Sequence, residues 1–453
     1  MENFNKLEQI VAKTIEQTVE TNHLDLDQFF INMEESFKNL GFRDNVKGGT
    51  DSILLIRLDN VGDFILTIPA IREVRMNYPN AFITLVVRKM TYNIAELCPY
   101  VNEVLSFDDV GNVNKMLHNI YFSAVFSKQY LWRRRYDLAF SFRCWDDGWC
   151  KLAQWLMYMS GARERVAYRH DAYRMYNEKL LPPEQNISYA LLTHPVINPP
   201  EIVHQVACCL YLIQAYGLRV RQIEMEVWYD KTDLYAAKKL LGNFGEGRVK
   251  VFVAVGASTP VRTYPIEKYL IAFREIISKG ASIIILGGPA EIDAAKFLED
   301  NLPKEFVKNV VPIKTGWRID SAIMSMVDMY IGNDTGIQHI AAALKKPIIV
   351  LSRVAKDHRE VTPNIPSEVD MYFPWQTFSI ILRPEHQLPE CKKFKSYAGC
   401  LAGIPHCITQ IKPSEIVAAY EKMSAFLRDI NQINSPAIIK NIDQVAPLKN
   451  LRD

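Results

Sequence analysis

A carboxylate stands where the chain leaves its first predicted strand, in a position from which it could act as a general base. In the segment IRLDNVGDFILTIPAIREVR, residues 56–75, an apolar run leads through a turn with Gly62 and Asp63 into a helical pattern. Ligands of open α/β sheets gather at the carboxyl ends of strands, where such a carboxylate could take a proton. Asp63 could instead be the N-cap of a helix starting at Phe64. The residues alone favour the N-cap.

A second stretch, MYIGNDTGIQHIAAAL at residues 329–344, has the residue types of a phosphate site. A buried strand is expected to end at Ile331, followed by a polar turn and an alanine-rich helix. The free N–H groups and positive end of such a helix suit a phosphate. A simple N-cap with a packed histidine is the alternative. The candidate ligand contacts in this stretch are Asn333, Asp334, Thr335, Gly336 and His339.

Two further turns follow predicted strands in the same half of the chain. VGASTPVRTYP, residues 255–265, offers hydroxyl groups and Arg262, whose guanidinium could pair with phosphate oxygens at two points. LGGPAE, residues 286–291, offers Glu291, which could accept hydrogen bonds from a ribose or an adenine, or could simply be a first-turn acid of a helix. The candidate contacts in these turns are Ser258, Thr259, Arg262, Gly287 and Glu291.

The acidic and cysteine clusters give weaker predictions. Asp146 and Asp147 follow a first-half strand and could contact acceptor hydroxyls or lie in a solvated loop, but an adjacent pair makes no convincing cation site. Cys391, Cys400 and Cys407 lie near two histidines, His386 and His406, and could ligate iron or zinc. Their spacing matches no compact metal motif, so reduced structural thiols are the favoured interpretation.

These candidates follow β-rich runs that alternate with helical patterns, which is typical of parallel sheets covered by helices on both faces. The expected strands are residues 52–58, 81–87, 103–107 and 137–142 in the first half and 249–255, 281–288, 327–332 and 346–351 in the second. GNFGEGR, residues 242–248, is the expected hinge. We therefore predict an α/β protein with two Rossmann-like halves whose strand ends face one cleft. The predicted divisions are a helical N-terminal extension (1–50), a first domain (51–243), a second domain (244–430) and an accessory tail (431–453).

Composition excludes several classes of protein. The 453 residues carry a formal charge of +2, so no global field points to nucleic acid. Eight scattered cysteines fit a reducing cytoplasm rather than a disulfide scaffold. The sequence has no run of eighteen apolar residues, which predicts a protein that is soluble or at most peripheral to a membrane. A dinucleotide oxidoreductase is disfavoured because no G-x-G-x-x-G follows a strand.

The order and spacing of several motifs resemble glycosyltransferase family 9, the ADP-heptose lipopolysaccharide heptosyltransferases. The motifs, between about residues 52 and 425, are RLDNVGDFILTIPAIREVRMNYP, WDDGWCKLAQWLMYMSGARERVAY, IVHQVACCLYLIQAYGL, GASTPVRTYP, LGGPAE, GNDTGIQHIAAALKKPIIVL and HCITQIKPSEIVAAYEKM. The resemblance implies a GT-B fold, in which two facing Rossmann-like domains border an interdomain cleft and the C-terminal domain holds most of the nucleotide sugar. It also implies a metal-independent, inverting transfer that requires no cofactor.

The resemblance implies roles for the candidate residues. Asp63 becomes the expected general base, and Arg262 with the Gly332–Gly336 turn stabilises the leaving diphosphate. Glu291 contacts the nucleoside, and Asp146 and Asp147 lie on the acceptor side. The implied reaction moves a heptose, or a related sugar, from an ADP-activated donor to a hydroxyl of a glycan such as lipopolysaccharide core. Two alternatives remain: a protein hydroxyl as acceptor, as in autotransporter-type heptosyltransferases, and a catalytically inactive module that binds nucleotide sugar or glycan.

The chain departs from the family at two places. Many relatives carry lysine where this chain has Arg262, which keeps the charge but changes the geometry. After Leu351, relatives commonly have a Gly-Pro-Thr turn, while this chain has SRVAKDHRE, residues 352–360, so no contact is assigned there. Some autotransporter-modifying relatives bind iron through cysteines in the region of the C-terminal cysteine cluster.

Two basic clusters and the N-terminal segment bear on which partners the protein could bind. The basic clusters at residues 132–135 and 162–174 could meet the phosphates of a lipid-linked acceptor or an anionic membrane at the cytoplasmic face of the inner membrane, or could be solvated. Apolar residues at helical spacing before residue 16 predict a helix packed on the body or on another subunit. An oligomer is therefore one of the expectations, and a nucleic-acid partner is not.

Overall fold

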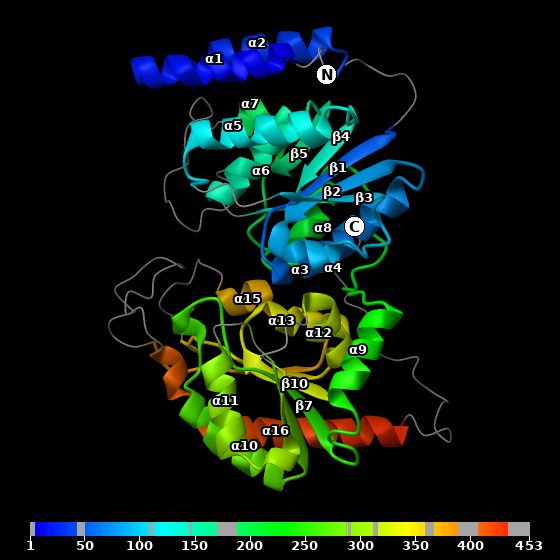
Figure 1. The fold of residues 1–453 in the computed structure, drawn as a ribbon, viewed down its shortest axis with the longest axis vertical. Coiled ribbons are helices and arrows are strands. Elements are labelled where there is room, and N and C mark those ends of the chain that lie inside the picture. Colours follow the sequence, from blue (N-terminus) through cyan, green and yellow to red (C-terminus); the bar gives the residue numbers. More distant parts are fainter. Residues whose placement is uncertain are drawn as a thin grey trace.

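The computed structural model describes residues 5–42, 50–107, 112–144, 147–169, 188–286, 288, 291–310, 316–357, 367–387 and 406–433. These residues form two α/β domains, one above the other in Figure 1, with a pair of N-terminal helices on the outer side of the first domain. Each domain has a six-stranded sheet in which all neighbouring strands are parallel. The predicted α/β class is confirmed.

The first domain has the strand order β3-β2-β1-β4-β5-β6. The strands are β1 (Ser52–Arg57), β2 (Phe82–Arg88), β3 (Glu103–Phe107), β4 (Leu138–Ser141), β5 (Glu164–Tyr168) and β6 (His194–Val196). The helices are α3 (Val61–Asn77), α4 (Lys89–Ala95), α5 (Met116–Phe126), α6 (Gly148–Met159), α7 (Ser188–Leu191) and α8 (Gln205–Ala215), with a π-turn at Ser127–Leu131. The central strand β1 is buried from Ile53 to Arg57, as expected for a parallel sheet with both faces covered.

The second domain repeats this plan with the order β12-β11-β10-β7-β8-β9. The strands are β7 (Val249–Ala254), β8 (Ala281–Leu286), β9 (Val307–Asn309), β10 (Met329–Asn333), β11 (Ile348–Leu351) and β12 (Ser379–Leu382). The helices are α9 (Lys231–Leu241), α10 (Ile266–Ser278), α11 (Ile292–Asn301), α12 (Gly316–Ser325), α13 (Gly336–Ala343), α15 (Glu368–Tyr372) and α16 (Pro413–Ile433), with single 3₁₀ turns at Pro260–Arg262, Lys304–Phe306 and Cys407–Gln410.

All eight predicted strands are present, and the structure adds four that the sequence reasoning missed. These are β5, β6, β9 and β12, which lie at or next to the edges of the sheets. The chain enters the second domain earlier than predicted. Helix α9 packs against α12 on the second sheet, so the crossing precedes α9 and does not lie at GNFGEGR, residues 242–248.

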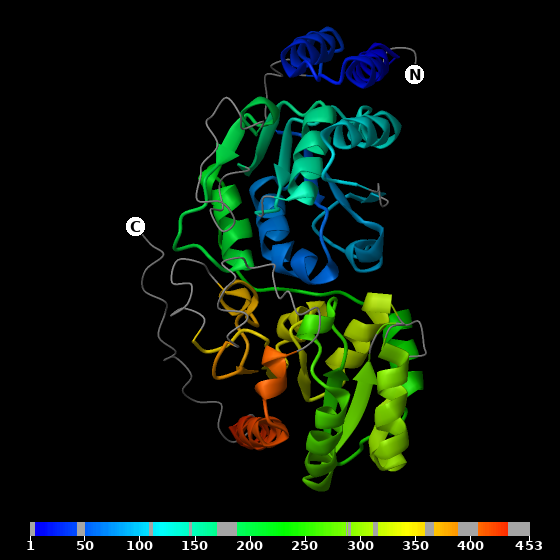
Figure 2. The ribbon, with the colours of Figure 1, turned by 90° about the vertical axis from the view of Figure 1, so that its left-hand side faces the viewer.

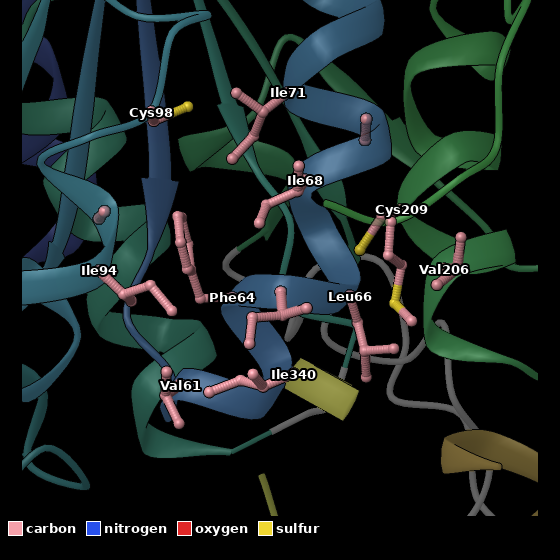
Figure 3. Packing of buried hydrophobic residues seen from close by; sticks show 14 of the residues in the cluster. Val61, Phe64, Leu66, Ile68, Ile71, Ile94, Cys98, Val206, Cys209 and Ile340 are labelled. Atoms are coloured by element: carbon pink, nitrogen blue, oxygen red, sulfur yellow. The ribbon is translucent and has the colours of Figure 1, made fainter. Parts of the chain in front are cut away.

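Helix α3 is buried on nearly all sides, whereas a helix on the surface of a globular protein is usually amphipathic. It packs on the sheet of its own domain, on α8, and on α13 of the other domain. Figure 3 shows Phe64, Ile68 and Ile71 of α3 packed in one cluster with Ile340 of α13. The apolar core is therefore continuous from one domain to the other, which fixes the N-terminal turns of α3 and α13 relative to each other.

The N-terminal extension is a helical hairpin, α1 (Asn5–Thr21) and α2 (Leu26–Asn39), at the far end of the first domain (Figure 2). Its buried residues, including Leu7 and Phe37, join the core under α5 and α6. The expectation of a helix packed on the body is confirmed. Among the described helices, none combines the length and apolar character that crossing a bilayer requires.

Candidate active site

The N-terminal turns of α3 and α13 meet at two glycines. A Cβ added to Gly62 would lie 2.8 Å from Gly336 Cα and 3.0 Å from His339 Cδ2, and one added to Gly336 would lie 3.1 Å from Gly62 N. Both positions therefore need glycine, because any side chain would separate the helices. Two helix N-termini, one from each domain, border the same space, and both favour negative charge there.

Asp63 lies in the first turn of α3, but it is not the N-cap. The helix begins at Val61 and its N-cap is Asn60, which makes no side-chain capping bond. Asp63 Oδ1 instead lies 3.5 Å from Arg57 Nη2, and 21% of the Asp63 side chain is exposed. The N-cap interpretation is wrong, and the carboxylate keeps access to solvent at the boundary between the domains.

Burial raises the pKa of Asp63, while the charges of Arg57 and Arg262 oppose that rise. Arg57 belongs to the same domain, whereas Arg262 belongs to the other. The electrostatic influence of Arg262 places it near Asp63 across the domain boundary. In its ionised form, a carboxylate with a raised pKa is a better proton acceptor than a free aspartate.

Arg57 is the anchor of an ion-pair chain along the carboxyl edge of the first sheet. This fully buried side chain donates from Nη1 to Phe142 O at 2.6 Å and lies 3.0 Å from Asp59 Oδ2 through Nε. Asp59 also pairs with Arg143, which in turn pairs with Asp147. The chain Asp63–Arg57–Asp59–Arg143–Asp147 thus runs from the α3 turn to the first turn of α6.

Asp147 is the end of that chain and the N-cap of α6. Its Oδ1 accepts from Cys150 N at 3.0 Å and from Arg143 Nε at 2.7 Å. Although burial favours the neutral form, the Arg143 hydrogen bond and charge outweigh it and hold the pKa of Asp147 below its ordinary value. Asp147 is therefore an ionised carboxylate at the site edge of the sheet. Asp146 lies outside the described residues.

Arg262 shares a buried carboxylate with a second arginine. Its Nη2 donates to Glu368 Oε1 at 2.5 Å, and Arg353 contacts the same carboxylate at 3.0 Å (Nε to Oε2) and 2.9 Å (Nη2 to Oε1). The Glu368 side chain is 2% exposed. Burial alone would raise the pKa of Glu368, but Arg262 and Arg353 outweigh it and lower the pKa.

Asp334 directly follows β10. This strand lies between β11, which precedes Arg353, and β7, which precedes Arg262. Burial raises its pKa to about 6, with Arg262 opposing and Glu368 adding to the rise. Its Oδ1 accepts from Gln338 Nε2 at 2.6 Å. The predicted neighbours Asp334 and Arg262 are thus brought together, and the carboxylate is partly exposed.

Thr335 and His339 lie at the N-terminal end of α13. Thr335 is the N-cap residue but makes no side-chain capping bond. His339 is 4% exposed, its Nδ1 is buried without a hydrogen-bond partner, and burial with His204 nearby lowers its pKa to about 3. His339 is therefore neutral at physiological pH and lies against Gly62.

Asn333 has a supporting role, which corrects its prediction as a donor contact. It is fully buried, and its amide is committed to the loop after β7. Oδ1 accepts from Tyr264 N at 3.1 Å and from Tyr269 Oη at 3.0 Å, while Nδ2 donates to Val255 O at 2.8 Å and Gly256 O at 3.1 Å. Asn333 consequently holds the loop that carries Arg262.

Glu291 and the β7 loop occupy the predicted nucleoside side. The Glu291 side chain lies over Gly256, where a Cβ would overlap it, and 3.0 Å from the Cβ position of Gly288. Glu291 is the N-cap residue of α11 and makes no side-chain capping bond, so its carboxylate stands at the positive end of that helix, close to where the alternative interpretation expected it. Ser258 and Thr259 are exposed in the loop before Arg262. Gly287 lies outside the described residues.

The C-terminal cysteine cluster is described only in part. Cys391 and Cys400 lie outside the described residues, and the side chain of Cys407 is buried. His406 accepts from Cys407 N at 2.6 Å, and His386 lies 3.4 Å from Asp357. Within the described segments, no group of three or more His, Cys, Asp or Glu side chains could hold a metal ion.

The first basic cluster lies at the opposite edge of the sheet from Asp63. Trp132 is buried and donates to Met159 O, Arg134 stacks over Phe82 at the start of β2 and Arg135 stacks over Phe42. The described part of the second cluster, 162–169, contains β5, and its Arg165 is buried on backbone carbonyls. Residues 132–135 therefore cannot contact an acceptor bound near Asp63.

Sequence reasoning missed five residues that shape the site, namely Arg57, Asp59, Arg143, Arg353 and Glu368. Arg57 and Asp59 belong to the motif RLDNVGD, one and three residues after Ile56, the last apolar residue of β1. Their position at the end of this strand was the signal that could have identified them. Arg353 lies in the segment where the chain departs from its relatives, and nothing local marks Glu368.

Comparison with known proteins agrees with this geometry. Residues 182–388 match the model of glycosyltransferase family 9 (heptosyltransferase). A search of curated proteins found no match. Among solved structures, a family 9 glycosyl transferase from Veillonella parvula is 16% identical with a TM-score of 0.63, covering 85% of this chain and 100% of that one.

Two E. coli enzymes are also similar in fold. ADP-heptose lps heptosyltransferase II is 16% identical, with a TM-score of 0.59 and coverage of 84% of this chain and 99% of the other. Heptosyltransferase WaaC with ADP is 15% identical, with a TM-score of 0.54 and coverage of 82% and 99%. The fold is therefore GT-B. Residues 182–388 therefore resemble glycosyltransferase family 9, and this match together with the fold supports a glycosyltransferase.

Proposed function

We propose that this glycosyltransferase moves a heptose from an ADP-activated donor to a hydroxyl of a glycan such as lipopolysaccharide core, with inversion at the anomeric carbon. The observation that carries the proposal is the position of Asp63 at the domain boundary, with Arg262 of the other domain close enough to oppose the rise of its pKa. The names of the two E. coli relatives support the choice of ADP and heptose.

In the proposed mechanism, the C-terminal domain binds the donor. The diphosphate lies at the N-terminal turn of α13, beside Gly336 and Arg262, where N–H groups and a guanidinium offer positive charge. Glu291 takes the ribose hydroxyls or the adenine.

The transfer needs one proton acceptor and one stabilised leaving group. The acceptor hydroxyl oxygen attacks the anomeric carbon, its proton passes to Asp63, and the bond from that carbon to the diphosphate oxygen breaks. The bonding electron pair leaves with the nucleoside diphosphate. Arg262 stabilises the charge that develops there, so the mechanism that we propose assigns no step to a metal ion.

A donor panel with a matched pair of variants tests the proposal. Release of nucleoside diphosphate would be measured with ADP-heptose, other nucleotide heptoses and nucleotide hexoses, each with a lipopolysaccharide-core acceptor. Asp63→Asn is expected to lower kcat about 10²–10⁴-fold with donor affinity retained, because the amide cannot accept the proton. Asp51→Asn is the control, since Asp51 is an exposed carboxylate at the opposite end of β1. Full activity of Asp63→Asn would refute the base assignment.

A further inference from the structure

Three adjacent strands of the second sheet each deliver a charged side chain to the same edge. In the order β11-β10-β7, the residues that follow the strand ends are Arg353, Asp334 and Arg262. The carboxyl ends of adjacent parallel strands meet at one edge of a sheet. Arg353 is therefore a site residue by position, although no contact was assigned to its segment from the sequence.

The two arginines are organised by Glu368 in an unequal arrangement. The carboxylate is 2% exposed, while the side chains of Arg262 and Arg353 are 28% and 18% exposed. Glu368 accepts a two-point contact from Arg353 and a further bond from Arg262, so it holds two cations that both reach toward solvent. Asp334 also interacts electrostatically with both arginines, and burial raises its pKa to about 6.

This arrangement suits an anion with two charged groups. Guanidinium groups bind phosphate oxygens at two points, and two of them side by side match the two phosphates of a diphosphate. Two guanidinium groups on one carboxylate oxygen repel each other, and the charge of Glu368 offsets that repulsion before a ligand arrives. Donors held in place in advance stabilise developing charge without reorganisation.

We propose that Arg353 is a second diphosphate-binding residue, held beside Arg262 by the buried carboxylate of Glu368. The inference rests on the proposed function and adds a residue to it. The leaving diphosphate is met by a pair of guanidinium groups, and Glu368 is a positioning residue that does not touch the donor. The departure from the Gly-Pro-Thr turn of relatives thereby supplies a cation at the nucleotide.

The opposing explanation is that Arg353 and Glu368 only attach α15 to the sheet. Calorimetric titrations with inorganic pyrophosphate, ADP and adenosine distinguish the two. Arg353→Met is expected to weaken pyrophosphate and ADP binding about 10- to 100-fold while adenosine binding stays near wild type. Its Tm should fall, because the buried Glu368 loses its two-point partner. Glu368→Gln should weaken pyrophosphate binding less, because both cations remain but lose their fixed geometry.

The control is Lys356→Met, which removes one cation from the same segment, where Lys356 is exposed and paired with Glu385. It should bind pyrophosphate as wild type does. Arg353→Lys keeps the charge without the two-point geometry, so its pyrophosphate affinity should lie between those of wild type and Arg353→Met. This variant tests the inference even if Arg353→Met does not fold. Pyrophosphate affinity equal to wild type in Arg353→Lys and Arg353→Met would overturn the inference.

An equal loss of adenosine affinity in Arg353→Met would also overturn it, since a purely structural contact would weaken the binding of all three ligands alike. Failure of the proposed function is distinguishable. If the wild-type protein binds neither pyrophosphate nor ADP, both proposals fall. If it binds ADP and transfers the sugar while Arg353→Met binds pyrophosphate normally, only the role of Arg353 falls.

Discussion

Arg57 and Asp63 form an ion pair between the end of the central strand and the first turn of α3, with 3.5 Å between Nη2 and Oδ1. Arg57 is fully buried and further held by Phe142 O and Asp59, so its position is fixed by the sheet. The side chain of Asp63 is partly exposed. The ion pair therefore positions the Asp63 carboxylate, our proposed base, against an arginine that strand β1 holds in place.

Arg57→Lys is expected to shift the acidic limb of the pH–kcat/KM profile toward higher pH. A lysine keeps one charge but cannot contact Asp63, Asp59 and Phe142 O together, so the carboxylate loses part of the interaction that opposes the rise of its pKa. We expect a shift of about half a pH unit to one unit. Arg75→Lys, at the other end of α3, is the control. An unshifted acidic limb in Arg57→Lys would show that Arg57 does not tune Asp63.

Gly62→Ala is expected to impair transfer more than stability. Its Cβ would lie 2.8 Å from Gly336 Cα, a backbone atom that cannot rotate away, so the two helix ends must separate. Misplacement of reacting groups by about 1 Å can cost about 10²-fold in rate, and overpacking typically costs about 1–3 kcal/mol of stability. Steady-state kinetics and thermal unfolding measure the two effects.

Val61→Ala is the matched control for Gly62→Ala, because Val61 Cγ1 lies at the same contact, 3.0 Å from the Cβ position of Gly336. It removes volume without forcing the helices apart. We expect a loss of stability with a smaller loss of kcat. Equal losses of kcat in both variants would contradict the claim that helix separation is the cause.

Much of the fold could be predicted because buried parallel strands are apolar runs that stand out from helical patterns. The exceptions have local reasons. Strand β5 lies in the sequence ERVAY, whose charges disguised a strand that ends in buried residues. Strands β6 and β9 have only three residues each, too few to show a period.

The residues of the candidate site also separate into those that the sequence could indicate and those that it could not. The sequence could indicate that Asp63, Arg262 and Asp334 lie at the carboxyl edge of their sheets, because each is in the connection or first helical turn after a central strand. It could not indicate Glu368, because its partner Arg262 is 106 positions away and no local pattern records that pairing. Asn333 was predicted to contact the donor but supports the loop after β7. The sequence does not distinguish these two roles, because both place an asparagine in a polar turn.

Asp334→Asn is expected to stabilise the ligand-free protein at neutral and alkaline pH. The pKa of Asp334 is raised to about 6, above the unfolded value, so the folded state binds more protons between about pH 4 and 6. Wild-type stability therefore decreases as pH rises through that range, and the ionised carboxylate costs stability above it. The variant should gain about 1–3 kcal/mol at pH 8.

Most of the gain from Asp334→Asn should disappear near pH 4, where the folded carboxyl is protonated and the unfolded one is about half protonated. Urea unfolding at pH 4, 6 and 8 measures the difference. Asp300→Asn in α11 removes an exposed carboxylate and should show no such pH dependence. A stability difference that is constant across this pH range would mean that Asp334 is not held in an unfavourable charged state.

His204 makes the contact between the domains sensitive to acid. It belongs to the first domain, its Nε2 donates to Phe373 O of the second at 3.0 Å, and its Nδ1 accepts from Val206 N at 3.2 Å. The ring stacks on Trp375 with centroids 4.5 Å apart. These bonds use the neutral imidazole, and burial lowers the pKa of His204 to about 4.

We expect stability to be lost as pH falls from about 6.5 toward 4, because the unfolded histidine takes up a proton that the folded one excludes. His204→Gln keeps polar groups without titrating there, so its unfolding free energy should fall less between pH 7 and pH 5, by about 1–2 kcal/mol. His23→Gln, at an exposed histidine of the N-terminal hairpin, is the control and should follow wild type. If His204→Gln loses as much stability as wild type over this range, the acid sensitivity arises elsewhere, and the buried His339, whose pKa is lowered to about 3, is the next residue to substitute.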